Sequence, residues 1–297
     1  MRIAVPITGS EASSGRFVEA LKQGMREQGY LDGEVVYDVE YASGQIERFD
    51  GMVQRLLSMN PDVIVLAGPA LTRLAMNATG TVPIVMANTS NAVGNKFVTS
   101  LARPGGNVTG ITTLYEDLLG KVCESLHELV PGAKRLAVLL NETNPSHEVF
   151  WESSKKGLNA FGKIPLRLAV NKPENIETTF RSLQGLNVQA AVVVVDFMFL
   201  TFREKIAALA LGAGLRTAFG TREHVDAGGL FSYGPSLSGN FRQSSRFIAR
   251  ILKGAKPGEL PVEQPTVFEF VINRKTARKL GISIPQPVLL RADQVIE

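Results

Sequence analysis

The chain contains one cysteine and three histidines among its 297 residues. A single cysteine excludes an internal disulfide and any metal site built from several cysteines. Cys123 falls at helical spacing between Leu119 and Leu126, which favours a thiol packed in the core over a reactive one. The histidines are scattered along the chain, so the sequence predicts neither a zinc site nor a histidine-based catalytic triad.

Long apolar runs and the short motifs of common enzyme classes are also absent. No segment approaches the roughly 18 apolar residues of a membrane-spanning helix. The chain has no Gly-x-Gly-x-x-Gly or Gly-Lys-Ser/Thr phosphate loop and no Gly-x-Ser-x-Gly nucleophile elbow. We therefore expect a protein that is not an enzyme and that binds no metal or cofactor.

The net charge is small, and the charged residues are spread evenly along the chain. The chain carries 32 basic and 28 acidic residues, for a net charge of +4, and this pattern favours a mixed solvated surface over a patch that binds nucleic acid. The apolar fraction of 44% and the length suit two domains with sizeable cores. The first residues run directly into an apolar segment, with no signal peptide. Both a cytosolic protein and the mature form of an exported one remain open.

Short apolar segments alternate with amphipathic segments along the whole chain. We expect strands at residues 3–6, 35–41, 63–67, 136–140, 166–170, 190–195 and 217–219, with another beginning at residue 82. Helical spacing of apolar residues separates them, as in Ile46, Phe49, Val53 and Leu56. Such alternation predicts an α/β fold with two parallel sheets, each with helices on both faces.

Residues 82–110 join the two halves of this pattern. The stretch opens as a buried strand, ends in polar residues and closes on a turn cluster at residues 103–107. We interpret it as the last loop of one lobe and the crossing into a second. Ligands in open α/β sheets bind beyond the carboxyl ends of the strands, so the strand-exit loops should face a ligand cleft between the lobes.

Polar, mostly uncharged residues recur at these strand exits. Such side chains bind small molecules by hydrogen bonds, although turn formation or helix capping explains each one equally well by itself. Their recurrence at one edge favours a ligand site. The candidates of this kind, together with the loop glycine after the third strand, are Thr8, Ser10, Gly68, Asn88, Thr89, Ser90, Asn91, Asn141 and Asn144.

Three further candidates are a carboxylate and two aromatic residues. Asp196 ends the most apolar strand, where a lone charge needs a partner, and helix capping is the alternative role. Tyr115 and Phe197 lie near predicted loops or hinges and are candidates for an aromatic clamp, with core packing as the alternative.

Several motifs give the chain a resemblance to a known family. They are SLARPGGNVTG at residues 100–110, ELVPGA at 128–133, AGGLFSYGPS at 227–236, ILKGAKP at 251–257, VINRKTA at 271–277 and LGI at 280–282. With these the chain resembles, over nearly its full length, the ABC-transporter substrate-binding proteins that take up tryptophan, tyrosine or phenylalanine. The resemblance implies the type I periplasmic-binding fold, in which the chain crosses three times between two lobes. It places residues 1–112 and 235–260 in the first lobe, and residues 113–234 and 261–297 in the second.

The resemblance also implies a function. The protein would be an extracytoplasmic solute-binding protein, periplasmic or anchored to the membrane, that closes two lobes on an aromatic amino acid or a related aromatic carboxylate. Its partners would be the permease and ATPase of an importer, and we expect a monomer that binds no nucleic acid. A ligand-sensing regulatory core of the same fold is the alternative, although no DNA-binding helix-turn-helix precedes the first strand.

One departure from the family concerns the charge of the ligand. Family members commonly carry Asp-Pro where this chain has Asn91 and Ala92, and threonine where it has Pro69. A carboxylate would pair with the ammonium group of an amino acid, whereas Asn91 can only form neutral hydrogen bonds. We therefore expect a ligand without an obligatory cationic group, unless Asp196 supplies the missing charge.

Overall fold

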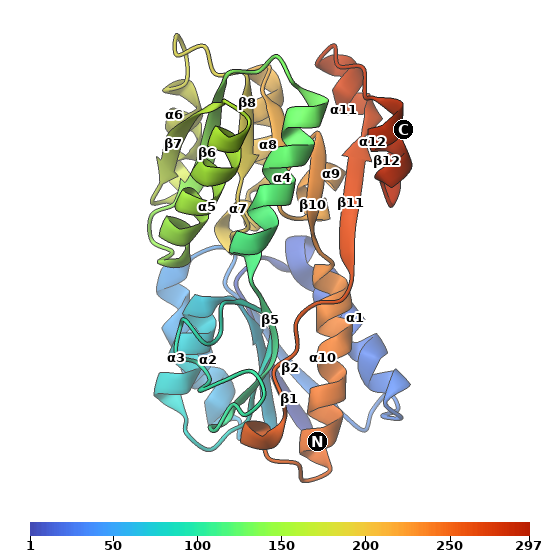
Figure 1. The fold of residues 1–297 in the computed structure, drawn as a ribbon. Helices are drawn as coiled ribbons and strands as arrows, with labels where there is room; N and C mark the ends of the chain where they lie inside the picture. Colours follow the sequence, from blue (N-terminus) through green and yellow to red (C-terminus); the bar gives the residue numbers. More distant parts are fainter. The chain divides into compact units, whose positions relative to one another are not determined.

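The computed structural model describes residues 1–297 and divides into two compact units. Unit 1 comprises Met1–Leu114 and Ser236–Val267, and unit 2 comprises Tyr115–Pro235 and Phe268–Glu297. The chain therefore passes three times from one unit to the other (Figure 1). Every helix is too short or too polar to cross a bilayer.

The third passage lies further along the chain than residue 260, where the sequence suggested it. The backbone N–H of Val262 donates to the carbonyl of Leu101, and the N–H of Glu263 donates to that of Gly110. The N–H of Thr112 in turn donates to the Glu263 carbonyl. These bonds hold residues 261–267 in unit 1.

Unit 1 contains a five-stranded parallel sheet in the order β2-β1-β3-β4-β5. Its strands are β1 (Arg2–Ile7), β2 (Val36–Tyr41), β3 (Val63–Ala67), β4 (Ile84–Ser90) and β5 (Val108–Thr113). All five residues of β3 are buried, because helices cover both faces of a parallel sheet. The strands that the sequence predicted at residues 3–6, 35–41 and 63–67 are thus present.

Four α-helices accompany this sheet, and two of them pack together along their length. The helices are α1 (Glu11–Glu27), α2 (Phe49–Ser58), α3 (Pro69–Ala78) and α10 (Leu237–Leu252). The rings of Phe17 on α1 and Phe241 on α10 stack with centroids 5.4 Å apart. Gly24 allows the close approach, since a Cβ there would lie 2.3 Å from the Arg242 carbonyl oxygen. The structure thereby places the helix after the second passage in unit 1.

Unit 2 contains a seven-stranded sheet in the order β12-β11-β10-β9-β8-β6-β7. Its strands are β6 (Arg135–Asn141), β7 (Ile164–Val170), β8 (Ala190–Val193), β9 (Arg216–Phe219), β10 (Phe231–Pro235), β11 (Phe268–Asn273) and β12 (Gln294–Ile296). Only the β10–β11 pair is antiparallel. The α/β class with two mainly parallel sheets is therefore confirmed.

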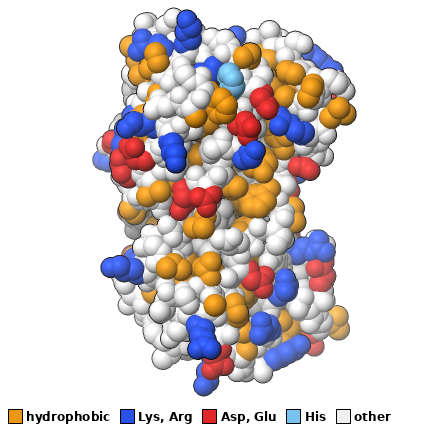
Figure 2. Space-filling view, viewed as in Figure 1, with side chains coloured by type: hydrophobic (Ala, Val, Ile, Leu, Met, Phe, Trp, Pro, Cys, Tyr) orange, Lys and Arg blue, Asp and Glu red, His pale blue; other side chains and the backbone are white.

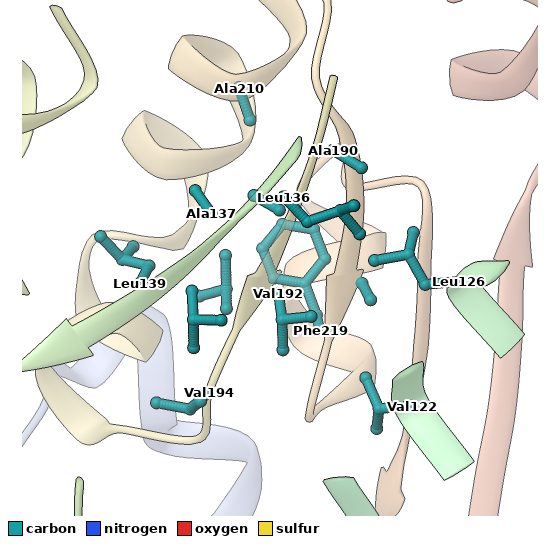
Figure 3. Close-up of a cluster of buried hydrophobic side chains, with 14 of the residues drawn as sticks. Val122, Leu126, Leu136, Ala137, Leu139, Ala190, Val192, Val194, Ala210 and Phe219 are labelled. Carbon is teal, nitrogen blue, oxygen red and sulfur yellow. The ribbon is translucent and has the colours of Figure 1, made fainter. Parts of the chain in front are cut away.

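Eight α-helices accompany this sheet. They are α4 (Tyr115–Leu129), α5 (Ser146–Ala160), α6 (Ile176–Arg181), α7 (Phe197–Thr201), α8 (Arg203–Gly212), α9 (Arg222–Asp226), α11 (Arg274–Lys279) and α12 (Gln286–Arg291). Figure 3 shows part of the core, where Leu126 of α4 and Val192 of β8 surround the ring of Phe219. Cys123 is buried in the same core, and burial raises the pKa of its thiol to about 12. On the face seen in Figure 2, basic and acidic side chains are interspersed.

Candidate functional site

The polar candidates of unit 1 lie at the carboxyl edge of its sheet. Strands β1, β3 and β4 are neighbours and parallel, so the residues that follow them share this edge. The candidates here are Thr8, Ser10, Gly68, Asn88, Thr89, Ser90 and Asn91. The topology therefore brings together residues that are up to 83 positions apart (8 to 91).

Ser10 caps helix α1 at this edge. Its Oγ accepts the backbone N–H of Ser13 at 3.2 Å, and the Ser13 Oγ accepts the N–H of Ser10 at 3.0 Å. This reciprocal capping box leaves other N–H groups of the first turn directed toward the edge. The amino end of a 17-residue helix carries a partial positive charge. Ser10 therefore has the capping role that the sequence left open, at a place suited to an anionic group.

Asn88 is held by two other polar side chains at the end of β4. Its Oδ1 accepts hydrogen bonds from Thr113 Oγ1 at 3.0 Å and from Asn240 Nδ2 at 3.1 Å. Thr89 is also buried, and its Oγ1 lies 3.2 Å from Thr72 Oγ1. Because its oxygen accepts two hydrogen bonds, the amide N–H₂ is the remaining polar group of the Asn88 side chain.

Gly68 acts through its backbone. Its φ of +89° is a conformation that favours glycine, and its N–H donates to the Asn88 carbonyl at 2.8 Å. Pro69 then begins α3 at a position where the missing N–H costs nothing. Gly68 thus shapes the loop beside Asn88.

The side chain of Asn91 stabilises the loop that follows β4. Its Oδ1 accepts the backbone N–H of Gly94 at 2.9 Å, and its φ of +41° is left-handed. The side chain of Asn95 donates to the carbonyls of Ser90 and Asn91. A Cβ on Gly94 would lie 2.6 Å from Asn91 Nδ2, so a larger residue there would displace the Asn91 side chain from the turn. The acceptor oxygen of Asn91 is therefore committed to a turn.

A second set of candidates lies at the carboxyl edge of the unit 2 sheet. Strands β6 and β8 are parallel neighbours. Asn141 ends β6, Asn144 follows in its loop, and Asp196 and Phe197 follow β8. The structure brings the two asparagine side chains onto the Asp196 carboxylate, although they lie 55 and 52 residues from it in the chain.

Asp196 is buried, accepts hydrogen bonds from three groups and has His147 beside it. Its Oδ1 accepts the backbone N–H of Met198 at 2.8 Å, and its Oδ2 accepts Asn144 Nδ2 at 2.9 Å. Asn141 Nδ2 lies 3.2 and 3.3 Å from the two oxygens, and His147 Nε2 lies 3.3 Å from Oδ2. All four neighbours present N–H groups to the carboxyl oxygens, which are acceptors. No lysine or arginine forms an ion pair with it, so its charge is solvated by neutral groups.

His147 is the member of this cluster that sequence reasoning missed. Its Nδ1 accepts the backbone N–H of Asn141 at 2.7 Å, which places the ring proton on Nε2. That proton points to the Val195 carbonyl at 3.3 Å and to Asp196. Burial is the main cause that lowers the pKa of His147. The only available signal was its position in the first turn of the helix that follows the β6 loop.

The two aromatic candidates have different surroundings. Phe197 is half-buried at the start of α7, next to Asp196, and is capable of contacting a ligand at this edge. Tyr115 is 2% exposed, and its ring packs edge-on against Phe150 with centroids 5.2 Å apart. Its hydroxyl has no hydrogen-bond partner. Tyr115 therefore belongs to the core of unit 2, the alternative role that the sequence left open.

Comparison with known proteins gives a family match over the whole chain. A family model described as "ABC transporter substrate binding protein" matches residues 2–296. A curated relative is the tyrosine-binding protein of Clostridioides difficile strain R20291. It is 22% identical over 267 residues, which cover 90% of this chain and 75% of the relative.

Solved structures resemble the whole chain as well. The ABC domain from Streptococcus pneumonia, in complex with L-Trp, is 26% identical with a TM-score of 0.91, and 99% of each chain is covered. A conserved domain protein from Vibrio cholerae is 25% identical with a TM-score of 0.92, again with 99% of each chain covered. The fold is that of the type I periplasmic binding proteins, as the resemblance of the motifs implied.

Proposed function

The chain belongs to the ABC transporter substrate-binding protein family, and we propose that it captures an amino acid with an aromatic side chain. The observation that carries this proposal is the Asp196 carboxylate. It is buried and surrounded by neutral N–H groups, with no lysine or arginine in contact. A ligand ammonium group is the chemical partner that this environment lacks.

The same cluster explains why His147 does not supply the charge. Protonation of His147 would place a hydrogen on Nδ1, which already accepts the Asn141 N–H. The ring is therefore held neutral. Its Nε2–H points to the Asp196 carboxylate but brings no positive charge to it. We therefore propose a ligand with an ammonium group, which is the alternative that the sequence left open through Asp196.

The carboxyl edge of unit 1 offers groups for the other end of an amino acid. We propose that the ligand carboxylate is bound by Thr8, Ser10 and the first-turn N–H groups of α1, with Asn88 as a further donor. Each sheet edge thus carries groups suited to one charged end of an amino acid.

The side chain of the ligand would pack on Phe197, which is half-buried beside Asp196. Two relatives support an aromatic side chain. One is named for tyrosine binding, and the other has L-Trp bound. An aromatic ring on Phe197 would contribute about 0.5–1.5 kcal/mol beyond its buried area.

Family membership supports the cellular role that we propose. The protein would act as a monomer outside the cytoplasm, in the periplasm or anchored to the membrane. It would pass its ligand to the permease and ATPase of an importer, would bind no nucleic acid and would catalyse no reaction. The absence of catalysis is supported by the buried Cys123 and by the engaged Nδ1 of His147.

Isothermal titration calorimetry tests the ligand proposal. L-Trp, L-Tyr and L-Phe should bind the wild type, and their deaminated acids should bind more weakly. Asp196→Asn should weaken the amino acids by about tenfold or more, because a charge-assisted hydrogen bond is lost. The same change should affect the deaminated acids less.

Glu174→Gln, at an exposed position, is the matched charge control and should change neither affinity. Circular dichroism would establish that Asp196→Asn remains folded. A wild type that binds the deaminated acids more tightly than the amino acids would contradict the proposal.

A further inference from the structure

Unit 2 carries a cavity at the end of β8 opposite to Asp196. It lies between α6 and α8, which are packed side by side (Figure 1). Its lining includes residues one or two positions before β8 and β9, such as Val188 and Leu215, whereas Asp196 follows β8. A four-residue strand separates the two places by about 13 Å. We call this cavity the α6–α8 groove.

The α6–α8 groove has the size and the lining of a small-molecule site. Its volume is about 720 Å³, within the range of about 300–1,000 Å³ that is usual for ligand pockets. Phe180, Leu183 and Leu215 form a buried apolar floor. A Cβ added at Gly185 or Gly212 would meet no atom within 4 Å, so the walls are open where larger residues would close them.

The rim of the groove is positively charged. Lys205 Nζ lies 3.7 Å from Glu177 Oε2, and Arg181 Nη2 bonds the other oxygen of the same carboxylate. Two cations thus share one anion, and all three side chains are at least 41% exposed. The acid group of a ligand could contact both Lys205 and Arg181. It would replace only solvent or one of their exposed ion pairs with Glu177.

We propose that the α6–α8 groove binds a small amphipathic anion, with its apolar body on Phe180, Leu183 and Leu215 and its acid group at Lys205 and Arg181. This site is independent of the amino-acid site, because the groove and Asp196 lie at opposite edges of one sheet. A ligand at the groove would hold α6 and α8 together at the amino ends of β8 and β9.

The test uses 1-anilinonaphthalene-8-sulfonate, an aromatic sulfonate whose fluorescence rises in apolar surroundings. It should bind the wild type at one saturable site, and octanoate should displace it. Octyltrimethylammonium, which has the same chain and the opposite charge, should not displace it. An aromatic amino acid at saturating concentration should not displace it either.

Two variants connect the signal to the groove. Ala208→Trp places a large ring in the groove from an exposed position on α8, and it should abolish saturable binding. The double variant Arg181→Gln, Lys205→Gln should raise the dissociation constant of the probe by about tenfold through loss of charge-assisted hydrogen bonds. Ala160→Trp and Lys156→Gln, exposed positions on α5, are the controls and should leave the constant unchanged.

Several results would overturn the proposal. They are the absence of saturable probe binding to the wild type, unchanged binding in Ala208→Trp, and equal displacement by the cationic detergent. A dimer in sedimentation that is lost in Ala208→Trp would instead assign the groove to contact between copies of the chain. Because the double variant changes only exposed side chains, it remains informative if Ala208→Trp fails to fold.

Discussion

The Nε2 atom of His147 lies 3.3 Å from Oδ2 of Asp196, and both side chains are buried in unit 2. The histidine joins two strand-exit loops, because its Nδ1 accepts the N–H of Asn141 while Nε2 points to the Val195 carbonyl. The buried carboxylate therefore depends on a neutral ring for part of its solvation.

Removal of this ring should destabilise the protein. His147→Ala leaves the buried N–H of Asn141 without an acceptor and takes one donor from Asp196. We expect a loss of about 2–4 kcal/mol in the free energy of unfolding, measured with urea, because each buried unpaired group costs about 1–3 kcal/mol. His147→Gln, which keeps one acceptor and one donor, should lose less. Equal losses in the two variants would indicate that packing, and not hydrogen bonding, is the role of the ring.

Two buried histidines predict that stability falls in mild acid. Burial lowers the pKa of His224 to about 3 and also lowers that of His147, whereas an unfolded histidine titrates near 6.5. The unfolded chain therefore binds more protons below pH ~6.5, and the stability that is complete above that value is lost as pH falls. His224 should contribute up to about 1.4 kcal/mol per pH unit in the lower part of this range, and His147 should add to the loss in the same direction.

Urea unfolding between pH ~7.5 and ~5 measures this slope. His224→Gln should reduce it, since Thr221 Oγ1 and the Phe199 carbonyl would no longer enclose a titrating group. A slope that is the same in wild type and variant would contradict the assignment to His224.

The alternation of strands and helices could be predicted from the sequence because burial on both sheet faces leaves a continuous apolar run. Residues 63–67 are the clearest case, and the structure has a strand at that place. The strand predicted at 190–195 ends at Val193 in the structure, since Val194 and Val195 already leave the ladder toward Asp196. Apolar character continues there without sheet pairing, so the pattern alone could not show the end.

The candidate site could be predicted only in part. Asn141, Asn144 and Asp196 could be predicted because they lie at the ends of strands, and the ends of parallel strands meet at one edge of the sheet. The contribution of His147 depends on contacts with residues 48 and 49 positions away, to which no local pattern points. The turn of Asn91 likewise depends on a left-handed backbone and on Gly94, and not on the residue type alone.

The unpaired hydroxyl of Tyr115 predicts a stabilising substitution. The group is buried without a hydrogen-bond partner, and burial raises its pKa. Tyr115→Phe removes the buried polar atom and keeps the ring against Phe150, so the free energy of unfolding should rise by about 1 kcal/mol. Tyr233→Phe, at a half-buried tyrosine of the same unit, is the control and should change it by less than about 0.5 kcal/mol. A loss of stability in Tyr115→Phe would mean that the hydroxyl has a partner such as an ordered water.

The last prediction concerns Gly110, which closes the motif at residues 100–110. Its φ is +125°, and a Cβ there would lie 2.2 Å from the oxygen and 2.6 Å from the nitrogen of Met86 on the neighbouring strand. Because these are backbone atoms of a paired strand, neither can move aside without breaking the β4–β5 ladder. Gly110→Ala should therefore lower the free energy of unfolding by about 2–5 kcal/mol, from backbone strain together with overpacking. Gly80→Ala is the matched control, since a Cβ at Gly80 meets no atom within 4 Å, and it should change stability by less than about 0.5 kcal/mol. Denaturant unfolding of the two variants measures the difference, and similar values for both would refute the steric role of Gly110.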